Sequence, residues 1–119
     1  ISHWIVVAER FLDKNNEKCW GELFKNVSKR TKLIHARVGT PNSIQVYKPK
    51  DDCENTDYFE NLWKDILSES EENEIFITPE YGPYPYKPLS IDFKGELKNN
   101  NDDLNEIVLS ALNRLKKLI

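Results

Sequence analysis

His35 and Glu80 are the two residues whose types and positions best fit metal-assisted chemistry. His35 lies inside the apolar run 32–38, and Arg37 follows two residues later, so period-two alternation puts both side chains on one face of a strand. Glu80 comes directly after a second apolar run, 74–78, and Pro79. Imidazole and carboxylate together suit Mn, Zn, Co or Fe better than Ca. Strands that pair lie about 4.8 Å apart, so neighbouring runs would let His35 and Glu80 reach one divalent ion.

Packing alone offers a competing explanation for each of these residues. A lone strand histidine is more often a satisfied core residue than a ligand, and an exposed loop glutamate is ordinary in a chain with 20 acidic residues. A histidine and an arginine on one buried face are harder to explain, because burying an unpaired guanidinium is costly. His3 has no local pattern that assigns it a role. The chain contains no Gly-rich phosphate loop, nucleophile elbow or H-E-x-x-H motif.

The elements that must position these residues are strands that alternate with helices. Both apolar runs are short, rich in β-branched residues and bounded by Gly and Pro, which is typical of buried parallel strands. Apolar residues keep helical spacing at 19–27, 59–67 and 104–115, and a further short helix is expected at Ile5 to Leu12. Asp57 with Glu60, and Asp103 with Glu106, have the spacing of a capping box, which predicts that a helix starts at each Asp. The pattern predicts an α/β protein with parallel strands.

Two strands cannot form a parallel sheet that is covered on both faces, and the one-sided helices need a larger sheet to pack on. The connections 39–56 and 79–102 are also long, since ordinary strand-to-helix loops have about 2 to 6 residues. Both follow the C-terminal end of a strand, which is the end where α/β barrels build their active sites. We therefore expect the chain to be part of a larger parallel α/β protein.

Composition excludes several classes of partner. The chain is 39% hydrophobic and 31% charged, with a formal net charge of -3, which argues against nucleic acid or an anionic membrane as the main partner. No apolar run approaches the roughly 18 to 20 residues of a membrane span. Cys19 and Cys53 lack metal-ligand spacing and are expected to be free thiols in a reducing, cytoplasmic setting. The oligomeric state stays open, a homo-oligomer included.

Three blocks of sequence resemble one known family. Ser2-His3-Trp4, Ile34-His35-Ala36-Arg37-Val38-Gly39-Thr40-Pro41 and Thr78-Pro79-Glu80-Tyr81-Gly82-Pro83-Tyr84-Pro85-Tyr86 are similar, in order and spacing, to the sugar phosphate isomerase/epimerase group of the xylose isomerase-like TIM barrels. The resemblance extends over essentially the whole chain. It implies the C-terminal part of a (β/α)8 barrel, with residues 1–119 beginning just after the sixth strand and covering the last two to three βα units.

The resemblance also implies a site. His35 would be a metal ligand on the seventh strand, and Glu80 would be the final ligand, on the eighth strand, and a catalytic base. His3 and Arg37 would bind substrate, and the family's Asp ligand would come just before Ile1. The implied cofactor is a divalent metal ion (Mn, Zn, Co or Mg), and the implied substrate is a small sugar or sugar phosphate.

The implied activity is isomerisation or epimerisation by metal polarisation and general-base proton transfer. The resemblance implies four metal ligands, Glu, Asp, His and Glu, of which this chain would supply the last two, so this chain alone is expected to be inactive. Two alternatives remain open at this point. Similar barrels host dehydratases and lyases, and a barrel fragment can also be non-catalytic.

Overall fold

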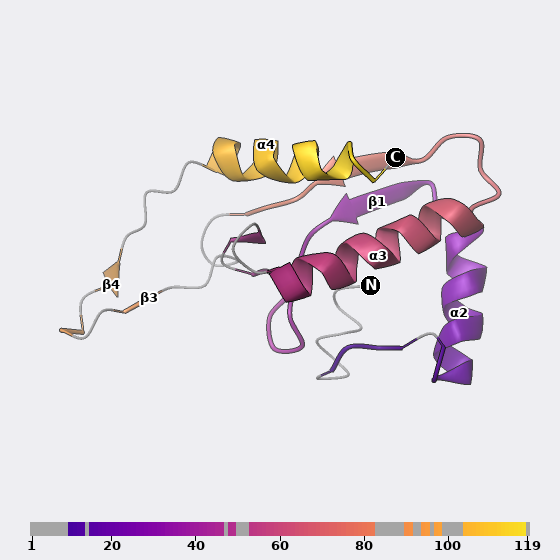
Figure 1. Ribbon diagram of the computed structural model, residues 1–119, viewed down its shortest axis with the longest axis horizontal. Coiled ribbons are helices and arrows are strands. Elements are labelled where there is room, and N and C mark those ends of the chain that lie inside the picture. Colours follow the sequence, from indigo (N-terminus) through magenta and orange to yellow (C-terminus); the bar gives the residue numbers. More distant parts are fainter. Residues whose placement is uncertain are drawn as a thin grey trace.

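The computed structural model describes residues 10–13, 15–46, 48–49, 53–82, 90–91, 94–95, 97–98 and 104–118. Helices and strands alternate along this part of the chain: α2 (Lys18–Ser28), β1 (Leu33–Ala36), α3 (Cys53–Glu69), β2 (Phe76–Pro79) and α4 (Leu104–Leu115). β1 pairs in parallel with β2, and α3 is the crossover between them (Figure 1). The predicted α/β class with parallel strands is confirmed. The described residues form a small α/β unit, not a closed barrel.

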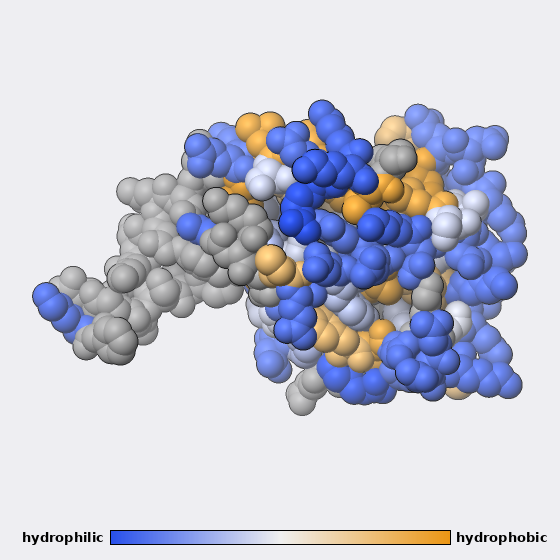
Figure 2. All heavy atoms as spheres, in the orientation of Figure 1, coloured by the Kyte–Doolittle hydropathy of each residue, from blue (hydrophilic) through white to orange (hydrophobic). Residues whose placement is uncertain are grey.

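Amphipathic spacing explains why the helices form and which side of each is buried. In α3 the buried apolar residues recur at intervals of three and four, as Phe59, Leu62, Trp63 and Ile66. In α2 the buried residues recur every four positions, as Trp20, Phe24 and Ser28. Together with Ile34 and Ala36 of β1, the apolar members of these stripes belong to one core cluster. On the side viewed in Figure 1, Figure 2 shows mainly hydrophilic residues, with several apolar patches between them.

The predicted cap at Asp57 is wrong, because α3 begins a full turn earlier, at Cys53. Asp57 and Glu60 instead face the last helix, where both contact Arg114. The Arg114 Nε atom donates to Glu60 Oε1 at 2.6 Å, and Arg114 Nη2 lies 3.4 Å from Asp57 Oδ1. The spacing of Asp57 and Glu60 thus lets both carboxylates contact Arg114, which joins α3 to α4. The other predicted cap, Asp103, lies outside the described residues.

β1 is shorter than the predicted run 32–38, and β2 is shifted toward the C-terminus relative to the predicted run 74–78. Neither strand is buried on both faces. Ile34 and Ala36 point into the core, whereas Leu33 is 49% exposed and Phe76 60% exposed. The cause is the arrangement of the helices. A space lined by residues of α3, α4 and both strands shows that the two helices lie over the same side of the sheet. The other side, named here the open face, carries the alternate residues of each strand.

One pair of strands was not expected from the sequence. β3 (Ser90–Ile91) and β4 (Leu97–Lys98) pair antiparallel within the segment predicted as one long loop, and they lie apart from the other elements in Figure 1. Gly95 lies between them with φ of 80°, a conformation that glycine adopts readily. Of the helix predicted at Ile5 to Leu12, residues 10–12 are described and are not helical. In the described part of the chain, none of the helices has the length and apolar character that a membrane span requires.

Candidate functional site

The side chains of His35, Arg37 and Glu80 meet at the C-terminal end of the open face. His35 pairs in register with Thr78, and the Glu80 amide donates to the Ala36 carbonyl at 3.2 Å, which extends the ladder by one residue. Alternation therefore puts Glu80 on the same face as His35. The Glu80 carboxylate is divided between its two neighbours: Oε2 lies 3.2 Å from His35 Nδ1, and Oε1 forms an ion pair with Arg37 Nη2.

Exposure differs between the three side chains. The His35 side chain is 60% exposed, Glu80 33% and Arg37 only 13%. A cavity of about 430 Å³ borders all three, and its remaining lining is largely apolar and comes from the end of α2, from β1 and from α3. The imidazole and the carboxylate can thus be reached by a ligand, while the guanidinium is largely enclosed and holds one carboxylate oxygen.

The separation of the two donor atoms suits a shared metal ion. Two donors in cis positions, each about 2.1 Å from one ion, are about 3.0 to 3.4 Å apart, and His35 Nδ1 and Glu80 Oε2 are 3.2 Å apart. The same distance suits a hydrogen bond donated by Nδ1–H, so metal binding at Nδ1 would require the tautomer that carries its proton on Nε2. The described residues contain no group of three or more His, Cys, Asp or Glu side chains that could hold a metal ion. The predicted substrate residue His3 lies outside the described residues.

The sequence pattern did not lead us to predict that Gln45 is buried beside the site. Gln45 is 1% exposed, and its carboxamide makes two hydrogen bonds to the backbone of Gly82: Nε2 donates to the carbonyl oxygen and Oε1 accepts from the amide, each at 2.9 Å. Gly82 is two residues beyond Glu80. The available signal was a single amide side chain between the apolar residues Ile44 and Val46, which is unusual for a solvated loop.

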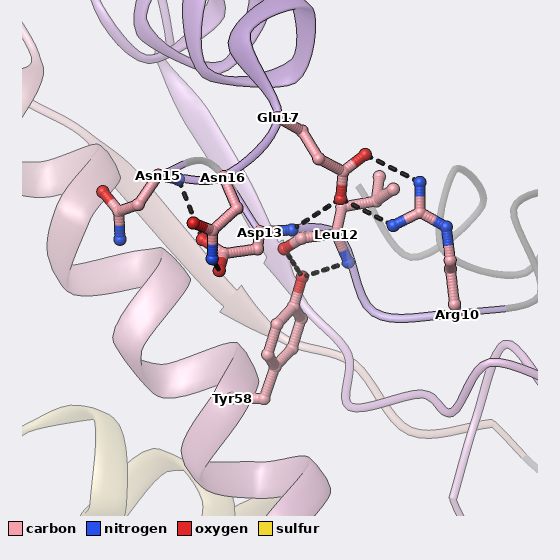
Figure 3. A network of polar contacts seen from close by, with 7 residues as sticks. All are labelled: Arg10, Leu12, Asp13, Asn15, Asn16, Glu17 and Tyr58. Carbon is pink, nitrogen blue, oxygen red and sulfur yellow. Dashed lines mark hydrogen bonds and ion pairs between the residues drawn. The ribbon is translucent and has the colours of Figure 1, made fainter.

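A second polar cluster anchors the segment before α2 and resembles no ligand site. The Tyr58 hydroxyl donates to the Leu12 carbonyl at 2.8 Å and accepts from the Leu12 amide at 3.2 Å (Figure 3). Arg10 donates two hydrogen bonds to the Glu17 carboxylate, at 2.6 and 2.7 Å. The Arg10 hydrogen bonds, with one from the Asp13 backbone, lower the pKa of Glu17 to about 2. Burial raises the pKa of Tyr58. These groups are paired with one another and hold α2 against α3.

Comparisons of the chain with protein-family models, with curated proteins and with solved structures find no match.

Proposed function

We propose that this chain is the C-terminal portion of a divalent-metal-dependent sugar or sugar phosphate isomerase/epimerase of the TIM-barrel type, located in the cytoplasm. The observation that carries the proposal is the meeting of His35, Arg37 and Glu80 at the carboxyl ends of two adjacent parallel strands. Parallel α/β enzymes build their active sites at that end of the sheet. The resemblance of the three sequence blocks points to the same residues.

The open face supports the barrel part of the proposal. Leu33 and Phe76 are exposed at the other end of the same face, and α3 and α4 pack against the opposite side, with α3 and the end of α2 also bordering the cavity beside β1. A barrel has this distribution, with helices outside and strand side chains directed inward, where neighbouring strands would cover the apolar residues. The polar residues would then lie at the mouth of the barrel and the apolar residues in its interior.

Each residue of the site has a role in this proposal. His35 Nδ1 and Glu80 Oε2 would hold the cation, which when bound supplies Lewis-acid polarisation of the substrate's carbonyl and hydroxyl oxygens. Glu80 would also move a proton between adjacent substrate carbons as general base. Arg37 keeps Glu80 Oε1 in place and would bind hydroxyl or phosphate oxygens through charge-assisted hydrogen bonds. His3 would bind substrate near the metal.

Measurements of metal binding test whether His35 and Glu80 are metal ligands. In the full-length protein that contains this chain, elemental analysis should find stoichiometric divalent metal, and titration with Mn²⁺ or Co²⁺ should show a site. His35→Ala should weaken metal affinity more than about tenfold, since even partners of metal ligands contribute 10- to 100-fold. Leu33→Ala is the matched control, because Leu33 lies on the same strand and face but at the apolar end. Unchanged affinity in the His35 variant would refute the assignment.

Activity assays test the proposed isomerisation or epimerisation reaction. Aldose–ketose interconversion and epimerisation of small sugars and their phosphates should require added Mn²⁺ or Co²⁺. Glu80→Gln should lower kcat by about 10²- to 10⁴-fold, the usual contribution of a general base. Loss of water or cleavage of a carbon–carbon bond in place of isomerisation would assign the same site to a dehydratase or lyase. Unchanged turnover in the Glu80 variant would contradict both forms of the proposal.

A non-catalytic chain is the second candidate, and one observation favours it. The described residues bring together two possible ligands, not three, and Arg37 neutralises part of the charge on one of them. If the chain is non-catalytic, the contacts of Glu80 with Arg37 and His35 serve only to join β1 to the loop after β2. Full-length protein that purifies without divalent metal and takes up none on titration would support it.

A further inference from the structure

Gln45 is the described buried side chain best placed to control the position of Glu80. It is 1% exposed, so its carboxamide is removed from water, which is costly unless both the N–H and the C=O find partners. Both bond to the same residue, Gly82, at 2.9 Å. A side-chain amide that pairs in this way with one backbone unit acts like a single rung of a β-ladder.

The chain brings Gln45 to this position by a tight return after β1. The Thr40 amide donates to the Ser43 carbonyl at 2.7 Å, and the Val46 amide donates to the Val38 carbonyl at 2.9 Å. Gly39 permits the return, because a Cβ there would lie 2.9 Å from the Ser43 carbonyl oxygen. The return therefore folds back beside the end of β1 with Gln45 directed toward the loop that follows β2.

We propose that Gln45 is the positioning residue that holds the Glu80 carboxylate against His35 and Arg37; its functional meaning rests on the function proposed above. The backbone from Glu80 to Gly82 is held at both ends, by the Glu80 amide on the Ala36 carbonyl and by the Gln45 carboxamide on Gly82. Without the second attachment, the loop loses both hydrogen bonds at the Gly82 backbone, two residues beyond Glu80. Glu80 would then spend less time between its two neighbours, although Gln45 itself touches neither metal nor substrate.

The test replaces Gln45 by Met, which has a similar length and no hydrogen-bonding group. Exchange of the Gly82 amide, followed by NMR in the metal-free protein, should be faster by about fivefold, since one hydrogen bond contributes about 1 kcal/mol. The ring signals of His35 should shift as the Glu80 contact is lost. Mn²⁺ affinity of the full-length protein should fall about 10- to 100-fold, as when a residue that orients a metal ligand is removed.

Thr56→Val is the matched control. Thr56 is also buried and polar, at 2% exposed, and its hydroxyl bonds the Pro49 carbonyl rather than the Glu80 loop. This variant should lower stability while leaving the Gly82 exchange rate, the His35 signals and the metal affinity unchanged. Equal changes in the two variants would show a general structural effect and overturn the proposal.

Metal-free measurements separate this proposal from the proposed function. If the wild type takes up no Mn²⁺, the metal assignment fails, but Gly82 exchange and the His35 ring signals still decide the role of Gln45. If Gln45→Met does not fold, exchange in the wild type decides it, because rapid exchange at Gly82 overturns the proposal without any variant. Unchanged His35 signals in a folded Gln45→Met protein overturn it as well.

Discussion

The Glu80 carboxylate is placed by two neighbours from β1 and the residues just after it. Arg37 and His35 project from the same face of the chain at and just beyond β1, and each takes one oxygen. The division matters chemically, because an oxygen held by a guanidinium is oriented while the other can still bind a cation. Glu80 is in this respect unlike Glu17, whose two oxygens are both bound by Arg10.

At the residue scale, Glu17 is expected to make the chain acid-sensitive. Hydrogen bonds from Arg10 and from the Asp13 backbone lower its pKa from the ordinary 4.5 to about 2. A lowered folded-state pKa contributes stability above the unfolded value, and this contribution is lost as the pH falls from about 4.5 through 2. Thermal unfolding of the wild type and of Glu17→Gln should therefore differ at pH 6 and converge by pH 2.

Glu22→Gln is the control for this prediction, since Glu22 is an exposed carboxylate on the same helix. Its unfolding midpoint should stay close to that of the wild type at pH 6. A difference between wild type and Glu17→Gln that persists unchanged at pH 2 would contradict the role of Glu17.

At the scale of elements, the turn after β1, residues 39–46, brings Gln45 to the loop that follows β2. The sequence predicted that β1 stops at Gly39-Thr40-Pro41, and it does end before them, at Ala36. The sequence did not predict that the chain would fold straight back to place Gln45, because hydrogen bonds between loops distant in sequence leave no periodic pattern. Helices α2 and α3 were predictable for the opposite reason, since their apolar spacing follows from local geometry.

Gly39→Ala tests this return directly. The added Cβ would lie 2.9 and 3.0 Å from the carbonyl oxygens of Ser43 and Ile44, and backbone atoms cannot easily give way. We expect a loss of about 1 to 3 kcal/mol in the free energy of unfolding, measured in urea, as for other overpacked sites. Asn42→Ala, at an exposed position of the same turn, should change it by no more than about 0.5 kcal/mol. Equal effects of the two variants would contradict the close approach at Gly39.

At the scale of the whole molecule, α3 and α4 pack against one side of the sheet, and the other side is largely exposed. The core lies between the strands and the helices, with Phe59 of α3 at 2% exposed, while the open face carries apolar residues toward one end and the polar site at the other. A side chain that is half exposed contributes less to folding than a buried one, because about half of its apolar surface stays in water.

Substitutions on the two sides of β1 should therefore differ strongly. In the 119-residue chain by itself, replacing Leu33 and Phe76 together by Thr should lower the free energy of unfolding by less than about 1 kcal/mol, as is usual for surface positions. Ile34→Ala, on the covered side and 5% exposed, should cost about 2 to 5 kcal/mol. Urea denaturation of both proteins gives the comparison. Similar losses in the two would show that the open face is buried in solution.

The α/β alternation, the amphipathic stripes of α2, α3 and α4, and the position of His35 and Arg37 on one strand face were predictable from the sequence. These features follow from local periodicity, which each segment carries independently of the others. The tertiary structure was needed to show that β1 and β2 are neighbours, that Glu80 reaches both residues, and that Gln45 bonds the loop after β2. These contacts join residues 37 to 45 positions apart, and the free energy of such pairings depends on the packed chain.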